Sequence, residues 1–249
     1  MIAITLQSEY VFSVFGFLVT NTFLTSVTVT ILLSLAGGLF YLHRTNERST
    51  NPFLRGWHIL VFELLKLTDS VTGDRTLSKR VLPLITTLFF FIVSANLIAL
   101  VPGFLGSFFV HTEHGNVPLF RSPNSDLTTT LALAIFTVVS IQYFSVKSLG
   151  IKQYIKRFVN FSNPIQFILG FFEILSESVK VLSFSFRLFG NIFAGEVLLL
   201  ITAFLIPYII PLPFMILEVF VGIIQAFIFS MLALTFIKTT TIRHIRSRG

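Results

Sequence analysis

Polar residues interrupt a long apolar stretch in the second half of the chain. Arg187, Asn191 and Glu196 lie among about forty mostly apolar residues, a stretch long enough to enter a membrane. An ionisable group at membrane depth is costly, so by default it indicates an ion or proton path. A carboxylate can relay a proton. An arginine stays protonated at physiological pH and can act only as a fixed cation.

The spacing of the polar residues in this stretch places five of them on one side of a helix over 164–206. At about 100° per residue, they fall within a sector of about 80°. The five residues are Glu173, Glu177, Lys180, Arg187 and Asn191. Glu196 falls on a different side. In the last apolar stretch, Glu218 and Gln225 are seven residues apart and share one side.

Two interpretations of these groups stay open at this point. The first is a path for ions or protons in which carboxylates are relay sites and Arg187 is a fixed cation. The second is structural: Arg187 pairs with Glu196 or Glu218 and holds the helices together. Buried ion pairs seldom stabilise a protein more than apolar packing does, which favours the first interpretation.

The composition indicates an integral membrane protein. Of 249 residues, 54% are hydrophobic and only 12% are charged, against about 25% in soluble domains, and the mean hydropathy is +0.87. The absence of cysteine excludes disulfides and thiol chemistry. The net charge of +7 is typical of a membrane protein with basic loops, so we expect no nucleic-acid partner.

The hydropathy pattern predicts an all-α polytopic membrane protein with a single membrane domain over 1–249. About five helices should cross the membrane, at 22–42, 81–104, 127–146, 164–206 and 213–238. Range 52–70 has apolar residues on one helical face, which favours an amphipathic helix on the membrane surface over a small helix in a soluble loop. Residues 1–10 have no basic segment and are not expected to be a cleaved signal peptide.

Basic residues predict the topology. Seven Lys or Arg lie between Arg44 and Arg80, one in 106–126, four in 147–157, none around Pro207 and four in 238–248. This alternation places the N-terminus outside and the C-terminus in the cytoplasm. A helix over 165–206 would be about 63 Å long, against a hydrocarbon core of about 30 Å. Two crossings there would put the basic C-terminus outside, so we expect one long, tilted helix, antiparallel to the last.

The loop at 106–126 contains His111, Glu113 and His114. Their spacing matches no strong metal-binding motif, so a solvated loop is favoured. We expect no metal and no cofactor.

The motif Ser-Phe-Arg187-Leu-Phe-Gly-Asn191-Ile-Phe-Ala-Gly-Glu196 resembles subunit a of the rotary F-type ATP synthase, in its membrane (Fo) sector. Ranges 96–102, 123–134 and 224–229 resemble the same family in the same order and spacing. The resemblance covers most of the chain from about residue 80 onward. Before residue 50 the similarity is only one of general character.

The resemblance implies a proton-conducting stator beside a ring of small c subunits, with a peripheral stalk of b-type subunits. Two aqueous half-channels would meet the ring, and Arg187 would attract the ring carboxylate and block a direct proton leak. The implied outer half-channel residues are Glu196, Glu218, Gln225 and Asn191. Those of the cytoplasmic half-channel are Glu173, Glu177 and Lys180. The chain would have no catalytic chemistry of its own.

The family often has histidine at one of the two acidic positions, whereas this chain has glutamate at both Glu196 and Glu218. The relay order of the two glutamates and the choice between proton and sodium stay open. The bacterial inner membrane is the expected location, with the mitochondrial inner membrane or the thylakoid as alternatives.

The sequence gives less support to three other functions. A secondary ion or solute transporter usually has paired repeats and broken helices, which the sequence does not show. A purely structural membrane scaffold would not need Arg187, Glu196 or Glu218. An intramembrane hydrolase lacks support because the sequence has no HExxH motif, no cysteine and no GxSxG motif.

Overall fold

The computed structural model describes residues 10–14, 17–43, 52–100, 109–112, 115–118, 121–158, 164–207 and 209–242. These ranges form seven α-helices: α1 Asn21–His43, α2 Pro52–Thr72, α3 Arg75–Leu100, α4 Leu127–Leu149, α5 Ile151–Phe158, α6 Pro164–Leu205 and α7 Pro211–Ile242. They also form two β-hairpins, β1 Tyr10–Val14 with β2 Phe17–Thr20 and β3 Phe109–Thr112 with β4 Gly115–Pro118, and the short 3-10 helix η1 Pro123–Ser125.

Five of the described helices are long and apolar enough to cross a membrane: α1, α3, α4, α6 and α7. This confirms the expected all-helical fold with five spans. The two hairpins and α5 were not expected from the sequence. Glu113 and His114 lie outside the described residues, and the side chain of His111 in β3 is not described either.

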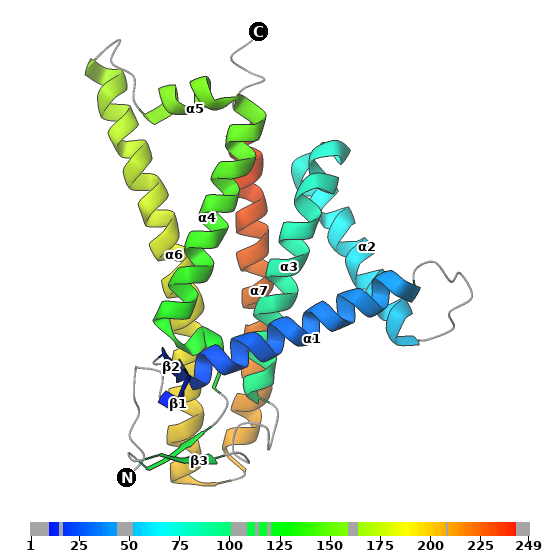
Figure 1. Cartoon of the computed structure of the whole chain (residues 1–249), viewed down its shortest axis with the longest axis vertical. Coiled ribbons are helices and arrows are strands. Elements are labelled where there is room, and N and C mark those ends of the chain that lie inside the picture. Colours follow the sequence, from blue (N-terminus) through cyan, green and yellow to red (C-terminus); the bar gives the residue numbers. More distant parts are fainter. Residues whose placement is uncertain are drawn as a thin grey trace.

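α6 is one continuous helix of 42 residues. The single long helix expected over 164–206 is therefore confirmed, and neither Gly190 nor Gly195 interrupts it. The Ile206 amide still donates to the Thr202 carbonyl at 3.1 Å, in the helical pattern of the last turn of α6, and the chain then reverses into α7. α7 returns antiparallel to α6 for 32 residues (Figure 1).

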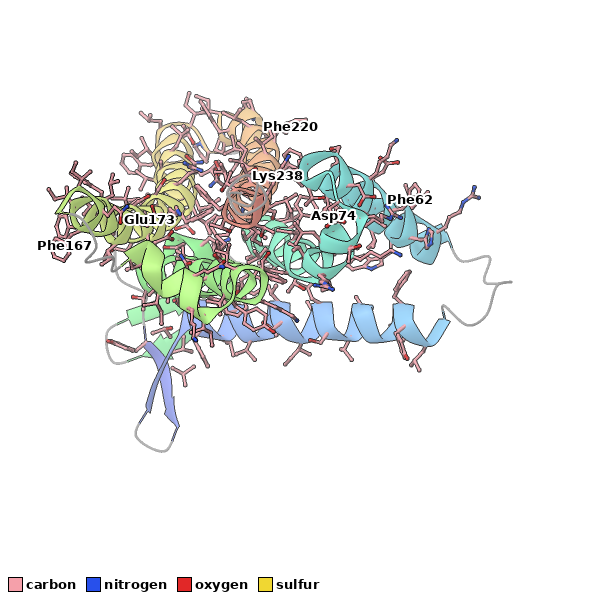
Figure 2. The ribbon with its side chains drawn as sticks, turned by 90° about the horizontal axis from the view of Figure 1, so that it is seen from above. Phe62, Asp74, Phe167, Glu173, Phe220 and Lys238 are labelled. Atoms are coloured by element: carbon pink, nitrogen blue, oxygen red, sulfur yellow. The ribbon has the colours of Figure 1, made fainter. Side chains whose placement is uncertain are left out.

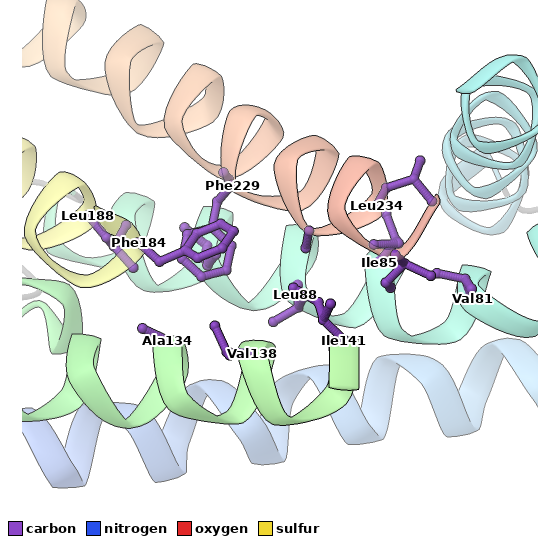
Figure 3. Packing of buried hydrophobic residues seen from close by; sticks show 14 residues of the cluster. Val81, Ile85, Leu88, Ala134, Val138, Ile141, Phe184, Leu188, Phe229 and Leu234 are labelled. Carbon is purple, nitrogen blue, oxygen red and sulfur yellow. The ribbon is translucent and has the colours of Figure 1, made fainter. Parts of the chain in front are cut away.

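The buried core lies where α3, α4, α6 and α7 meet (Figure 3). Phe184 of α6 packs its ring against Phe229 of α7, with ring centroids 4.6 Å apart. Leu188, one turn later, is fully buried in the same cluster. Phe184 comes three residues before Arg187 in the sequence, and Leu188 directly follows it. Because both are buried, the core fixes the rotation of α6 about its own axis.

α2 packs against α3 through one face, with the Trp57 and Phe90 rings stacked at 4.3 Å between centroids and Leu64 buried. Ile59 and Phe62 stay exposed, and Figure 2 shows Phe62 projecting from the rim of the molecule. The membrane-surface position of α2 remains a prediction.

Asp126 caps the start of α4, because its side chain accepts a hydrogen bond of 2.9 Å from the Thr128 amide. The same carboxylate accepts a hydrogen bond of 3.2 Å from the Thr22 hydroxyl. Asp126 therefore also joins the start of α1 to the start of α4.

A buried amide network joins α3, η1 and α7. Asn96 donates to the Gly222 carbonyl at 3.0 Å and accepts from the Asn124 amide at 2.6 Å. Gly222 has no side chain, and a Cβ there would lie 3.1 Å from the Asn96 Cβ. The network holds η1, and with it the segment before α4, against the α3–α7 pair.

Replacing Asn96 by alanine should destabilise the fold. The substitution leaves the Asn124 amide without its acceptor in a buried site, which costs about 1–3 kcal/mol. Thr87→Ala on the same helix is the control, because the Thr87 hydroxyl bonds only to the Pro83 carbonyl within the described part of the chain. This substitution should change stability by less than about 0.5 kcal/mol. Denaturant unfolding in detergent measures both. Equal stability of the two variants would contradict the role of the network.

Candidate functional site

The predicted polar residues lie along α6 on either side of Arg187. Lys180 precedes Arg187 by about 10 Å along the helix axis, and Glu196 follows it by about 14 Å. Each group meets different partners, so the site has three parts: the arginine itself, a cluster toward the start of α6, and a cluster toward its end.

Arg187 is half-buried, and its guanidinium donates a hydrogen bond of 3.3 Å to the Ser183 hydroxyl one turn earlier. Among the described residues, Arg187 forms no ion pair with a carboxylate. The structural alternative of a pair with Glu196 or Glu218 is therefore wrong for this part of the chain. A fixed cation without an internal counter-ion is suited to meet an anion from outside.

A cavity of about 240 Å³ opens beside Arg187, toward the start of α6. Its polar lining is Ser176, Lys180, Ser183 and Arg187, and Leu232 and Phe236 of α7 contribute apolar walls. The cavity connects the arginine to Lys180 along one side of the α6–α7 pair. The cavity therefore lies on the side of α6 that the sequence predicted Lys180 and Arg187 to share.

Lys180 is tightly held at this cavity. Its ammonium donates to Glu177 Oε1 at 2.7 Å, and each of the two side chains is only 13% exposed. The ammonium also lies 4.9 Å from the centre of the Phe236 ring on α7. Glu173 lies one turn before Glu177 on α6, and Figure 2 shows it near that end of the helix.

Asn191 and Gln225 join the two long helices one turn after Arg187. The Asn191 amide donates to the Gln225 side-chain oxygen at 2.8 Å, and Gln225 is buried. The sequence predicted both as site residues but did not predict that they bond to each other. The bond sets the distance between α6 and α7 next to the arginine.

Glu218 of α7 lies directly against the backbone of α6. Its carboxyl group occupies the space where a Cβ on Gly195 would be, so only glycine at 195 permits this approach. Among the described residues Glu218 forms no ion pair or hydrogen bond, although it interacts electrostatically with Glu196. Two carboxyl groups are therefore gathered at the end of the site away from Lys180.

Glu196 pairs with Arg121, a residue that the sequence reasoning missed. Nε and one terminal nitrogen of Arg121 donate to Glu196 Oε2 at 3.3 and 3.2 Å, and the two side chains are 17% and 30% exposed. The Arg121 amide also bonds the Thr25 hydroxyl on α1 at 3.3 Å. The available signal was that Arg121 is the one basic residue in the loop at 106–126.

Breaking the Arg121–Glu196 pair should destabilise the protein through a measurable coupling. Arg121→Met leaves the Glu196 carboxylate without its cation and should lower the free energy of unfolding by about 1.5–3 kcal/mol. Glu196→Gln combined with Arg121→Met should recover part of this loss. A double-mutant cycle by denaturant unfolding in detergent measures the coupling energy, and a value near zero would contradict the pair.

The sequence model of the family described as ATP synthase A chain matches residues 10–238. The chain is 38% identical over 171 residues to the ATP synthase subunit a of Moorella thermoacetica, covering 69% of this chain and 68% of the relative.

Two further bacterial relatives bear the same name. The ATP synthase subunit a of Legionella pneumophila (strain Paris) is 30% identical over 244 residues, which cover 97% of this chain and 96% of the relative. That of Campylobacter jejuni (strain RM1221) is 31% identical over 182 residues, 72% of each chain. With a family match over most of its length and relatives at this level, the chain belongs to the ATP synthase subunit a family.

Proposed function

We propose that the chain conducts protons as the stationary membrane subunit of an ATP synthase, with Arg187 as the fixed cation between two half-channels. The observation that carries the assignment of Arg187 is its position: it is half-buried, lacks a carboxylate partner among the described residues and lies between two polar clusters on α6. As a subunit a, the chain is a component of the proton channel and is not itself catalytic.

The partner of Arg187 in this proposal is a carboxylate on a ring of small c subunits. The side of α6 next to Arg187 exposes large apolar side chains, among them Val179 and Phe186. Phe220 on α7 is exposed too, on the side of the molecule that faces away from α1 (Figure 2). An apolar partner with one carboxylate would cover this surface and neutralise the arginine. Arg187 would attract the ionised carboxylate and repel protons from a direct path.

The outer half-channel is formed by the cluster toward the end of α6. Glu218 has no ion pair among the described residues, so its carboxyl group is available to exchange a proton. Glu196 is neutralised by Arg121, which suits a fixed anion better than a proton carrier. We therefore assign the relay to Glu218, with the Asn191–Gln225 pair lining the route to Arg187.

The cytoplasmic half-channel corresponds to the cavity at Lys180. It reaches Arg187 from the opposite direction and is lined by hydroxyl groups of Ser176 and Ser183. The Lys180–Glu177 pair stands at this cavity, and Glu173 lies one turn further from Arg187. Because basic residues favour the cytoplasmic side, the charge pattern of the loops predicts that the start of α6 faces the cytoplasm.

The chain is a multi-pass membrane protein, and its relatives in Legionella and Campylobacter support a bacterial inner membrane as its location. Contact with b-type subunits of a peripheral stalk belongs to the same proposal. The carboxylate site of the ring, and not this chain, would select between proton and sodium.

Arg187→Ala should abolish proton-driven ATP synthesis while the complex still assembles. Without the cation, the ionised carboxylate of the ring loses its partner. Protons can then pass directly between the two half-channels without rotation of the ring. ATP synthesis in energised membrane vesicles and the subunit content of the purified complex measure the two effects. Lys66→Ala, which removes an exposed cation on α2, is the matched control and should synthesise ATP normally. Normal synthesis by the Arg187 variant would refute the assignment.

Glu218→Gln should slow proton flux without uncoupling it from ATP synthesis. Loss of a positioned proton-transfer group lowers the rate by about a hundredfold or more. Passive proton flux through the membrane sector, measured with a pH-sensitive dye in vesicles, tests this. Glu63→Gln on α2 removes an exposed carboxylate and serves as the control. Unchanged flux in the Glu218 variant would remove this residue from the relay.

A further inference from the structure

The eight-residue helix α5 lies across the space between the end of α4 and the beginning of α6 (Figure 1). Gly150 separates it from α4 with φ of 82°, a left-handed conformation that favours glycine. At about 12 Å, α5 is too short to cross a membrane. It is a helical connection between two spans.

α5 is attached to both of its neighbours. The Tyr154 hydroxyl donates to the Gln142 side-chain oxygen on α4 at 3.0 Å. At the other end, the backbone of Phe158 packs against Gly170 of α6, where any side chain would overlap the Phe158 carbonyl. These contacts hold α5 in one position relative to α4 and α6.

Two residues on the apolar side of α5 are largely exposed in the described protein. Ile151 and Ile155 are one turn apart on the same side, and they are 66% and 54% exposed. Lys152 is exposed on another side of the helix. Exposed apolar residues on one side of a short helix and basic residues on another are typical of helices that lie in the boundary between headgroups and acyl chains.

The sequence on both sides of α5 is rich in basic residues. Between Asp126 and Glu173 the sequence contains Lys147, Lys152, Lys156 and Arg157 and no acidic residue. α2, the other described helix that does not count as a membrane span, is different: Lys66 pairs with Glu63 at 4.0 Å, and Asp69 pairs with Arg75 of α3. Topology selects for basic residues but is little affected by acidic ones, so it does not require their absence around α5.

We propose that α5 and the end of α4 form a binding surface for the phosphate headgroups of anionic phospholipids. Lys147 and Lys152 provide cations for the headgroups, while Ile151 and Ile155 enter the acyl-chain boundary. The proposed surface is defined by these four residues. Anionic lipid bound there would hold the start of α6 at a fixed depth, because α5 contacts α6 at Gly170.

The test uses the purified ATP synthase that contains this chain. The detergent-solubilised complex is incubated with equal amounts of phosphatidylglycerol and phosphatidylcholine, passed through gel filtration, and the retained lipids are quantified by mass spectrometry. Phosphatidylglycerol should be retained in excess. The double variant Lys147→Gln/Lys152→Gln should lose affinity for it by about fivefold for each lysine neutralised.

Two matched variants separate charge from position. Lys147→Arg/Lys152→Arg keeps the charge and should retain phosphatidylglycerol as the parent does, and Lys66→Gln on α2 should also behave as the parent. Equal retention by the glutamine double variant and the parent would overturn the proposal. So would an equal loss in Lys66→Gln. Loss of another subunit from the double variant with unchanged lipid retention would identify an acidic protein partner instead, and would also overturn it.

Discussion

An arginine in a membrane-spanning helix, with no carboxylate partner among the described residues, is the constraint on which the rest of this structure depends. Such a group is costly in an apolar environment unless a partner or water meets it. Within the described chain, Arg187 has a hydroxyl on its own helix, at Ser183, and a cavity beside it. Four other charged groups of the site form pairs of their own: Glu196 bonds Arg121, and Lys180 bonds Glu177. The arginine is thereby left for an anion from another subunit.

The surrounding fold serves to hold that arginine in one orientation. Phe184 and Leu188 bury the adjacent side of α6, about 60° and 100° from Arg187 around the helix, in the core shared with α3, α4 and α7. The Asn191–Gln225 bond joins α7 to α6 one turn after Arg187, and the Glu218 carboxyl group lies against Gly195 one turn further along α6. Because these contacts are interhelical, a change in any of them would alter the proposed proton path without a substitution of Arg187 itself.

The sequence predicted the features that depend on local pattern and charge. The continuous α6 followed from loop charges and helix length. The Arg121–Glu196 pair could not be predicted, because it joins residues 75 positions apart through a loop whose course is set by Asn96 and Thr25. Likewise, α5 depends on a single positive-φ glycine and on packing against Gly170, which hydropathy does not report.

The most direct test of the account is disulfide cross-linking from the side of α6 next to Arg187. The chain has no cysteine, so one introduced at Phe186, which is 53% exposed, is unique within this subunit. Its partner is a cysteine introduced beside the carboxylate of the small ring subunit, and Leu35→Cys on α1 is the control because α1 lies on the opposite side (Figure 2). The account predicts a cross-link from Phe186→Cys and none from Leu35→Cys. No cross-link at Phe186, or an equal one at Leu35, would contradict it.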